Sequence, residues 1–210
     1  MKSMHRILST CVLAAAATAC GSGVQAPQHY YVLDPAPASP SAPVAVATPP
    51  EASALLVTPT TAAGFYDAQA IVYSPAFGTR AYYQLNSWTE PPSRRLVALL
   101  TERLRRSGAF GAVTTATGGA RGTLVLDTQL DEIYHDTGVP PGSAKISLTA
   151  TLSDPARRVV AGQRRFTASA PAPTPDAAGA VQAFDVALGP LLDDVVAWAG
   201  QTAAQPGIRP

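Results

Sequence analysis

The sequence contains only two cysteines, and both lie within its first 20 residues. No disulfide and no cysteine-ligated metal site can therefore form in residues 21–210. A chain without such cross-links relies on an apolar core. Its length of 210 residues is sufficient for one domain with a substantial core.

An excess of charge of one sign is also missing. The chain has 15 Lys and Arg against 14 Asp and Glu, which gives a formal net charge of +1. Nucleic-acid binding needs a concentrated basic surface. The near-neutral balance therefore argues against a nucleic-acid partner, and also against membrane binding by charge alone.

The sequence also lacks a recognisable set of catalytic residues. Of three histidines, His5 lies in the N-terminal segment, His29 lies beside a predicted tether, and only His135 falls well inside the predicted domain. His135 with Asp136 and Glu132 forms either a metal or acid–base cluster, or simply the polar end of a strand. We favour the strand end because metal sites need three or four convergent ligands. With no P-loop and no G-x-S-x-G elbow, we predict no enzyme, no catalytic residue, no metal and no cofactor.

The N-terminus carries the most specific signal. Two basic residues precede a mostly apolar, uncharged run over residues 7–19, as in secretory signals, and this run is too short to span a bilayer permanently. The small residues before Cys20 resemble the lipobox of bacterial lipoproteins, although Ala17 stands where Leu is usual. The resemblance implies a signal peptide over 1–19 and acyl chains on Cys20. A secreted protein with a chance cysteine is the alternative.

Composition divides the rest of the chain. Residues 20–28 form the lipidated cysteine and a short Gly/Ser/Pro tether, and 29–202 form the domain. We predict that residues 34–53, within this domain, form a Pro/Ala-rich loop. Residues 203–210, which follow the domain, are predicted to form a disordered tail. Eight extended residues span about 28 Å, so the tether would keep the domain close to its membrane.

Apolar periodicity predicts the secondary structure. Strands are predicted at 30–33, 55–58, 70–73, 81–85, 110–117, 123–134, 145–153 and 158–168, and helices at 94–106 and 176–201. The strands at 70–73 and 81–85, at 110–117 and 123–134, and at 145–153 and 158–168 are predicted to pair as hairpins. The predicted class is α+β, a single mixed, mostly antiparallel sheet with two main helices on one face.

Two details of this pattern can be tested. In residues 123–134, one parity is mostly apolar and is predicted to form one face; it contains Leu124, Leu126, Thr128, Leu130 and Glu132. In the last helix, Gly189-Pro190 interrupts the apolar stripe. An interior proline costs about 3 kcal/mol, so we predict either a kink or two helices there.

The string Trp88-Thr89-Glu90-Pro91-Pro92 stands just before the first helix. Trp88 is predicted to be a core anchor or a recognition residue, because tryptophan serves both roles. Trp88 and Glu90 are our candidate partner contacts. The arginine-rich helix 94–106 is either a headgroup-binding face or a solvated face, and we favour the solvated face.

Three strings in order carry a family resemblance: Tyr30-Tyr31-Val32-Leu33 soon after the cysteine, Phe65-Tyr66-Asp67-Ala68-Gln69-Ala70-Ile71-Val72-Tyr73, and Trp88-Thr89-Glu90-Pro91-Pro92. This order resembles the ABC-type transport auxiliary lipoprotein family, which includes the PqiC-like lipoproteins, over about residues 29–200. Pro92 stands where that family usually has an apolar residue, and Ala68 replaces a common arginine.

The resemblance implies a lipoprotein of an MCE (mammalian cell entry) type system that moves lipids across the periplasm. Its partners would be an MCE-domain protein and the ABC permease and ATPase, all on separate chains. Gly21 follows the cysteine where an aspartate often marks inner-membrane retention, so we expect docking at the periplasmic face of the outer membrane. The alternative is a periplasmic binding protein that carries phospholipid in an apolar groove between sheet and helices.

Overall fold

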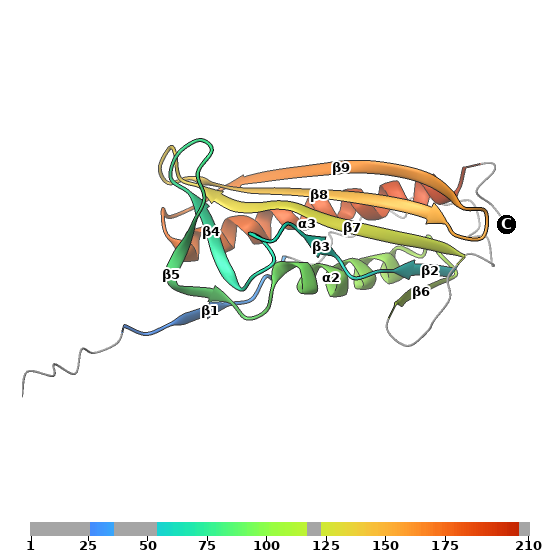
Figure 1. Cartoon of the computed structure of the whole chain (residues 1–210), viewed down its shortest axis with the longest axis horizontal. Helices are drawn as coiled ribbons and strands as arrows, with labels where there is room; N and C mark the ends of the chain where they lie inside the picture. Colours follow the sequence, from blue (N-terminus) through green and yellow to red (C-terminus); the bar gives the residue numbers. More distant parts are fainter. Residues whose placement is uncertain (1–25, 36–53, 117–122, 206–210) are drawn as a thin grey trace, which may run out of the picture.

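The computed structural model of the protein describes residues 26–35, 54–116 and 123–205. The predicted signal peptide, Cys20, most of segment 34–53, the predicted Gly118-Gly119 turn and residues 206–210 lie outside the described residues. The described part is elongated, with long strands in front of a long helix (Figure 1).

The elements, in chain order, are β1 (His29–Tyr31), β2 (Ala54–Val57), β3 (Thr61–Ala62), β4 (Ala70–Ser74), β5 (Ala81–Trp88), α2 (Pro92–Ser107), β6 (Ala112–Thr115), β7 (Leu124–Asp136), β8 (Ser143–Asp154), β9 (Val159–Pro171) and α3 (Ala177–Ala203). All the strands belong to one mixed sheet, in which β7, β8 and β9 form long antiparallel ladders. α3 packs on β8 and β9, and α2 packs on α3 and β6. The predicted α+β class is confirmed.

β7 is the centre of the sheet. One of its edges pairs along almost its whole length with β8. Along the other edge it pairs in turn with β2, β3 and β4, each of them parallel to β7. A 13-residue strand thus brings three short strands from the N-terminal half of the chain into one sheet.

Two of the three predicted hairpins are confirmed, because β4 pairs antiparallel with β5 and β8 with β9. The predicted pairing of 110–117 with 123–134 is wrong. β2 lies between β6 and β7 and runs parallel to both. The side chains of Leu55 and Val57 in β2 are completely buried, which suits a central strand, whereas β6 is only partly buried and takes the edge.

The predicted parity of β7 holds only as far as Leu130, which is fully buried. A bulge between Leu130 and Glu132 then shifts the register against β8. Beyond it the buried positions are Ile133 and His135, so the prediction that Glu132 shares the apolar face is wrong. The bulge turns Glu132 toward Arg80 instead.

Proline and glycine set the limits of α2. The helix begins at Pro92, where the missing N–H has no intrahelical acceptor to lose. It ends at Gly108, which has a left-handed φ of 66° and so tolerates the turn that stops the helix. The predicted helix 94–106 is confirmed and extends by one or two residues at each end.

Asp176 caps the start of α3: its Oδ1 accepts a hydrogen bond of 2.8 Å from the backbone N–H of Gly179. The helix continues through Pro190, so the two-helix alternative is wrong; the kink stays a prediction. Leu188 and Leu191 are buried on either side of Pro190. Packing on both sides of the proline offsets the lost hydrogen bond and keeps the helix continuous.

The core lies between the sheet and the helices. Its largest fully buried side chains are Phe184, Leu55, Ile71, Leu96, Leu100, Leu104, Leu126, Leu130, Leu148, Leu152, Leu188 and Leu192. They come from both helices and from strands of both halves of the chain, so the described residues share one core. In the described ranges, no helix is long and apolar enough to cross a membrane.

Candidate docking site at one end of the sheet

The structure places Trp88 inside the core. Its side chain is 2% exposed, and its ring meets that of Phe184 edge to face, with the centroids 5.8 Å apart. This position matches the core-anchor alternative. Glu90, two residues later, is partly exposed in the turn before α2. Of the two candidate contacts, Glu90 is therefore the one that a partner can reach.

The turn around Glu90 is held by backbone contacts from two directions. The N–H of Thr89 donates to the carbonyl of Tyr31 at 2.8 Å, which ties the turn to β1. Gln69 Nε2 donates to the carbonyl of Thr89 at 2.7 Å, and the Gln69 carbonyl accepts from the N–H of Trp88 at 2.6 Å. All three strings of the family resemblance therefore meet at this turn.

A side-chain hydrogen bond joins the same strings. The hydroxyl of Ser93 donates to Asp67 Oδ1 at 2.8 Å, and Ser93 is 5% exposed. Ser93 lies in the first turn of α2, where a carboxylate is favoured by the helix dipole. Asp67 therefore fixes the start of α2 against the turn that precedes β4.

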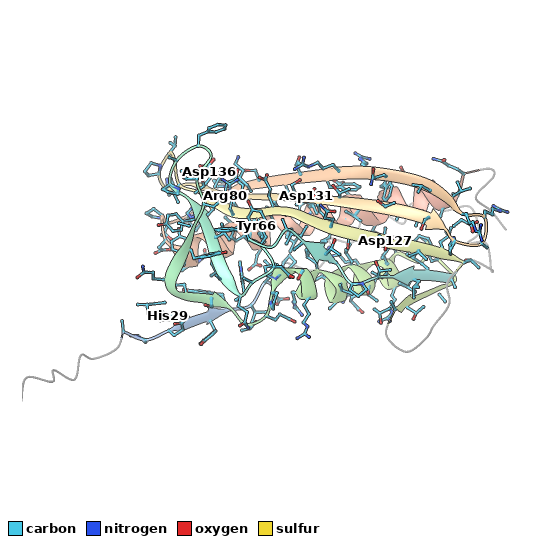
Figure 2. All side chains as sticks on the ribbon, viewed as in Figure 1. His29, Tyr66, Arg80, Asp127, Asp131 and Asp136 are labelled. Atoms are coloured by element: carbon cyan, nitrogen blue, oxygen red, sulfur yellow. The ribbon has the colours of Figure 1, made fainter. Side chains whose placement is uncertain are left out.

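Arg80 forms the densest polar cluster at this end of the molecule. Its Nε donates to the hydroxyl of Tyr66 at 2.9 Å, and its terminal nitrogen pairs with Glu132 Oε1 at 3.2 Å. The guanidinium also lies 3.7 Å from the centroid of the Tyr134 ring, within cation–π range. Figure 2 shows Arg80 close to Tyr66 and Asp136 at the left end of the sheet.

The electrostatics of this cluster keep the guanidinium charged. Burial lowers the pKa of Arg80, but the hydrogen bond to Tyr66 and the nearby Tyr134 and Glu132 outweigh that effect and raise the pKa above its ordinary value. Arg80 therefore holds together the start of β5, the 64–69 turn and β7.

A hollow of about 740 Å³ opens beside this cluster. Arg80, Glu132 and Tyr134 form its polar wall, and two loops form its rim. Phe77 at the tip of the β4–β5 loop is 106% exposed, and Val139 in the β7–β8 loop is 80% exposed. Large apolar side chains this exposed commonly mark an interaction site when they gather at one place.

Sequence reasoning missed this end of the molecule. Phe77 and Val139 each stand in a short turn segment, Pro75–Thr79 and Thr137–Gly142, that contains no charged residue. An exposed turn normally carries polar side chains, so an aromatic or branched apolar residue in an uncharged turn was the available signal. The Arg80 cluster gave no such signal, because its members come from three separate segments.

His135 is fully buried and hydrogen-bonded on both ring nitrogens. Nε2 lies 3.2 Å from the carbonyl of Pro141, which can only accept, so Nε2 carries the proton. Nδ1 then accepts from the hydroxyl of Tyr83 at 2.8 Å. Burial lowers the pKa of His135 and raises that of Tyr83 to about 12, so both groups are neutral near pH 7.

The structure separates the three residues of the suspected metal or acid–base cluster. Glu132 pairs with Arg80, Asp136 Oδ1 accepts from the N–H of Gly138, and His135 faces Tyr83. This is the arrangement of a satisfied core histidine. Among the described residues, no group of three His, Cys, Asp or Glu is placed to hold a metal ion.

Comparison with known proteins agrees with the resemblance. The family model described as "ABC-type transport auxiliary lipoprotein component" matches residues 31–196. The chain therefore belongs to the family of ABC-type transport auxiliary lipoprotein components. This is a family of transport accessories and not of enzymes. No curated protein matches the chain.

Solved structures share the fold. A protein from Xanthomonas campestris, whose crystal structure was assigned to the family model DUF330, is 24% identical, with a TM-score of 0.71 over 83% of this chain and 96% of its own. An uncharacterized protein is 14% identical, with a TM-score of 0.61 over 83% of this chain and 98% of its own. A hypothetical protein from Chlamydia trachomatis is 10% identical, with a TM-score of 0.50 over 73% and 98%.

Proposed function

We propose that this protein is a lipid-anchored accessory component of an MCE-type lipid transport system. In this proposal its acyl chains insert at the periplasmic face of the outer membrane, and its domain docks the transport complex there. The observation that carries the proposal is the family match over residues 31–196 of a chain with a lipobox-like cysteine at position 20.

The anchor would act through the apolar area of its acyl chains and through the short length of the tether that follows Cys20. Each buried methylene of an acyl chain contributes about 0.8 kcal/mol, so two or three chains on Cys20 hold the protein stably on a membrane. The described domain begins only six residues after Cys20. A tether this short raises the local concentration of the domain at one surface, and docking gains affinity without new contacts.

Co-purification tests the proposal. The acylated chain is extracted from membranes in mild detergent, and we expect it to bring down an MCE-domain protein together with a permease and an ATPase. Stable, acylated protein that repeatedly brings down none of these would contradict the docking function. Radiolabelled palmitate that fails to attach to the chain would contradict the anchor.

Glu90 can be examined in the same experiment. Reversing its charge with Glu90→Lys should reduce recovery of the MCE-domain protein if the turn before α2 is part of the contact. Glu102→Lys is the matched control, because Glu102 lies within α2 on its exposed face, paired with Arg106 one helical turn away. Equal recovery with the two variants would remove Glu90 from the proposed contact.

The alternative function, a lipid carrier, requires an apolar groove between sheet and helices. Leu148 on the sheet and Leu188 and Leu192 on α3 are at most 1% exposed, so side chains fill this space in the described structure. Mass spectrometry of the mature domain, produced without the anchor, separates the two functions. A dock retains no phospholipid, whereas a carrier retains it in near-stoichiometric amount.

A further inference from the structure

Two loops at one end of the sheet combine an exposed apolar side chain with an absence of charged residues. The β4–β5 loop, Pro75–Thr79, and the β7–β8 loop, Thr137–Gly142, contain no charged residue. Each presents one large apolar side chain to solvent, Phe77 at 106% and Val139 at 80% exposure. Both side chains line the rim of the same hollow, so they form one surface, which we call the apolar tip.

The apolar tip lies at the end of the molecule from which the N-terminal tether leaves. In Figure 1 the β4–β5 and β7–β8 loops and the start of β1 are all towards the left end of the long axis, with the loops at its upper side and β1 at its lower side. Figure 2 labels His29, the first residue of β1, and Asp136, the last residue of β7, at that end. The attachment point of the tether and the apolar tip therefore share one end of an elongated domain.

The opposite end has a different chemistry. The β8–β9 turn lies at the right end in Figure 1 and contains Asp154, Arg157 and Arg158. α2 also finishes with Arg105 and Arg106 in its last turn. The two loops at the tether end thus contain no charged residue, whereas the β8–β9 turn at the other end combines charged side chains with the exposed Val159 and Val160.

We infer that the apolar tip contacts the bilayer that holds the acyl chains of Cys20, with Phe77 and Val139 entering its interfacial region. The inference rests on the proposed anchor. Between Cys20 and the first described residue there are five residues, which span less than about 20 Å, so the anchored leaflet lies within reach of this end of the domain. Aromatic and branched apolar side chains in uncharged loops suit the headgroup boundary.

The polar groups behind the apolar tip are less exposed than its apolar side chains. Arg80 and Glu132 form an ion pair, and the carboxylate of Asp136, which also lines the hollow, accepts a hydrogen bond from the N–H of Gly138. The side chains of Arg80 and Glu132 are 22% and 41% exposed, against 106% for Phe77. The domain would then stand on the membrane with its long axis pointing away, and its charged end would face the periplasm.

Single-cysteine labelling of the acylated chain tests the inference. Cys11 is removed with the signal and the Cys20 thiol is blocked by acylation, so an introduced cysteine is the only reactive thiol. The variants are Phe77→Cys, Val139→Cys and, as a control at the charged end, Val160→Cys, which is 61% exposed in β9. Each purified protein carries an environment-sensitive NBD label and is reconstituted in phosphatidylcholine vesicles with or without brominated acyl chains.

We expect the labels at positions 77 and 139 to shift to shorter emission wavelengths in vesicles and to be quenched by the brominated chains, with no change at position 160. Acylated protein whose three labels respond alike would overturn the inference and leave the proposed anchor in place. A blue shift at 77 and 139 without bromine quenching would also overturn it, because a protein surface would then cover the apolar tip. Absence of acylation would overturn both the anchor and the inference. Unchanged unfolding midpoints for all three variants establish that the labels report on a native fold.

Discussion

The indole of Trp88 and the phenyl ring of Phe184 meet edge to face at the junction of β5 and α3. Their centroids are 5.8 Å apart, and the ring planes are inclined at 61°. The contact joins residues 96 positions apart in sequence and closes the core beneath the start of α2. The contact thus fixes the end of β5 three residues before the two prolines at the start of that helix.

Truncating this contact should be costly. We expect Trp88→Ala to lower the free energy of unfolding by about 3–5 kcal/mol, since it leaves a large cavity in a core position. Urea unfolding of the mature domain, followed by circular dichroism, measures the change. The control is Val186→Ala on α3, where the side chain is 66% exposed and the cost should stay within about 0.5 kcal/mol. Similar stabilities for the two variants would show that Trp88 is not part of the core.

Much of the fold follows from local sequence signals. The β8–β9 hairpin is predictable because apolar and polar residues alternate on both sides of the Asp154-Pro155 turn. α2 is predictable because prolines open it and Gly108 ends it. Alternation, however, decides which face of a strand is buried and not which strand lies beside it. The insertion of β2 between β6 and β7 was therefore hidden, although the strand itself was predicted at residues 55–58.

The candidate site was harder to predict than the fold. Arg80, Glu132 and Tyr134 meet only because β4 and β5 fold over the end of β7, and because the bulge after Leu130 changes which side chains face them. No periodicity in the sequence marks such a bulge. Trp88 was visible as an unusual residue, but whether it is buried depends on Phe184, which lies far along the chain.

An ion pair between the helices gives a second prediction. Arg103 on α2 donates to Asp193 Oδ1 on α3 at 2.5 Å, and the Arg103 side chain is only 6% exposed. We expect Asp193→Asn to lower the free energy of unfolding by about 1–3 kcal/mol, because a charged hydrogen bond at a buried guanidinium is weakened.

The matched control for this pair is Glu102→Gln, which breaks the exposed pair between Glu102 and Arg106 within α2. Exposed pairs of this kind contribute about 0.3–0.5 kcal/mol. Denaturant midpoints at low and high salt distinguish the two variants, since only the exposed pair should depend noticeably on salt. Equal effects from both substitutions would mean that the α2–α3 pair does not stabilise the fold.

The burial of His135 predicts that the free energy of unfolding depends on pH. Burial lowers the pKa of His135 in the folded protein below its ordinary value of 6.5, so the unfolded state binds a proton more readily. The stability this residue contributes is present above about pH 6.5 and is lost as the pH falls through the folded pKa, with a limiting slope of about 1.4 kcal/mol per pH unit.

We expect unfolding free energies measured between about pH 7 and pH 5 to fall in the native chain, and to fall less in His135→Gln. His29→Gln is the control, since it also removes a histidine but at an exposed position in β1. Parallel profiles for the native chain and His135→Gln would contradict a buried, neutral histidine.

The anchor can be separated from the fold. Cys20→Ala removes the only proposed acylation site but no residue of the described core, so we expect the same unfolding midpoint and a release of the protein from membranes into the periplasmic extract. Cell fractionation and thermal melting measure the two effects. A variant that no longer folds would contradict a domain whose core is independent of the anchor.

The insertion of β2 between β6 and β7 also constrains the order in which the strands can pair as the protein folds. When the first 116 residues are available, β2 can pair with β6, but its other edge stays open until β7 emerges. Long-range closure of this kind slows folding and leaves an apolar strand edge unprotected in the incomplete chain. A newly made molecule therefore benefits from being kept unfolded until β7 is present, which is the condition that passage through a secretion channel imposes.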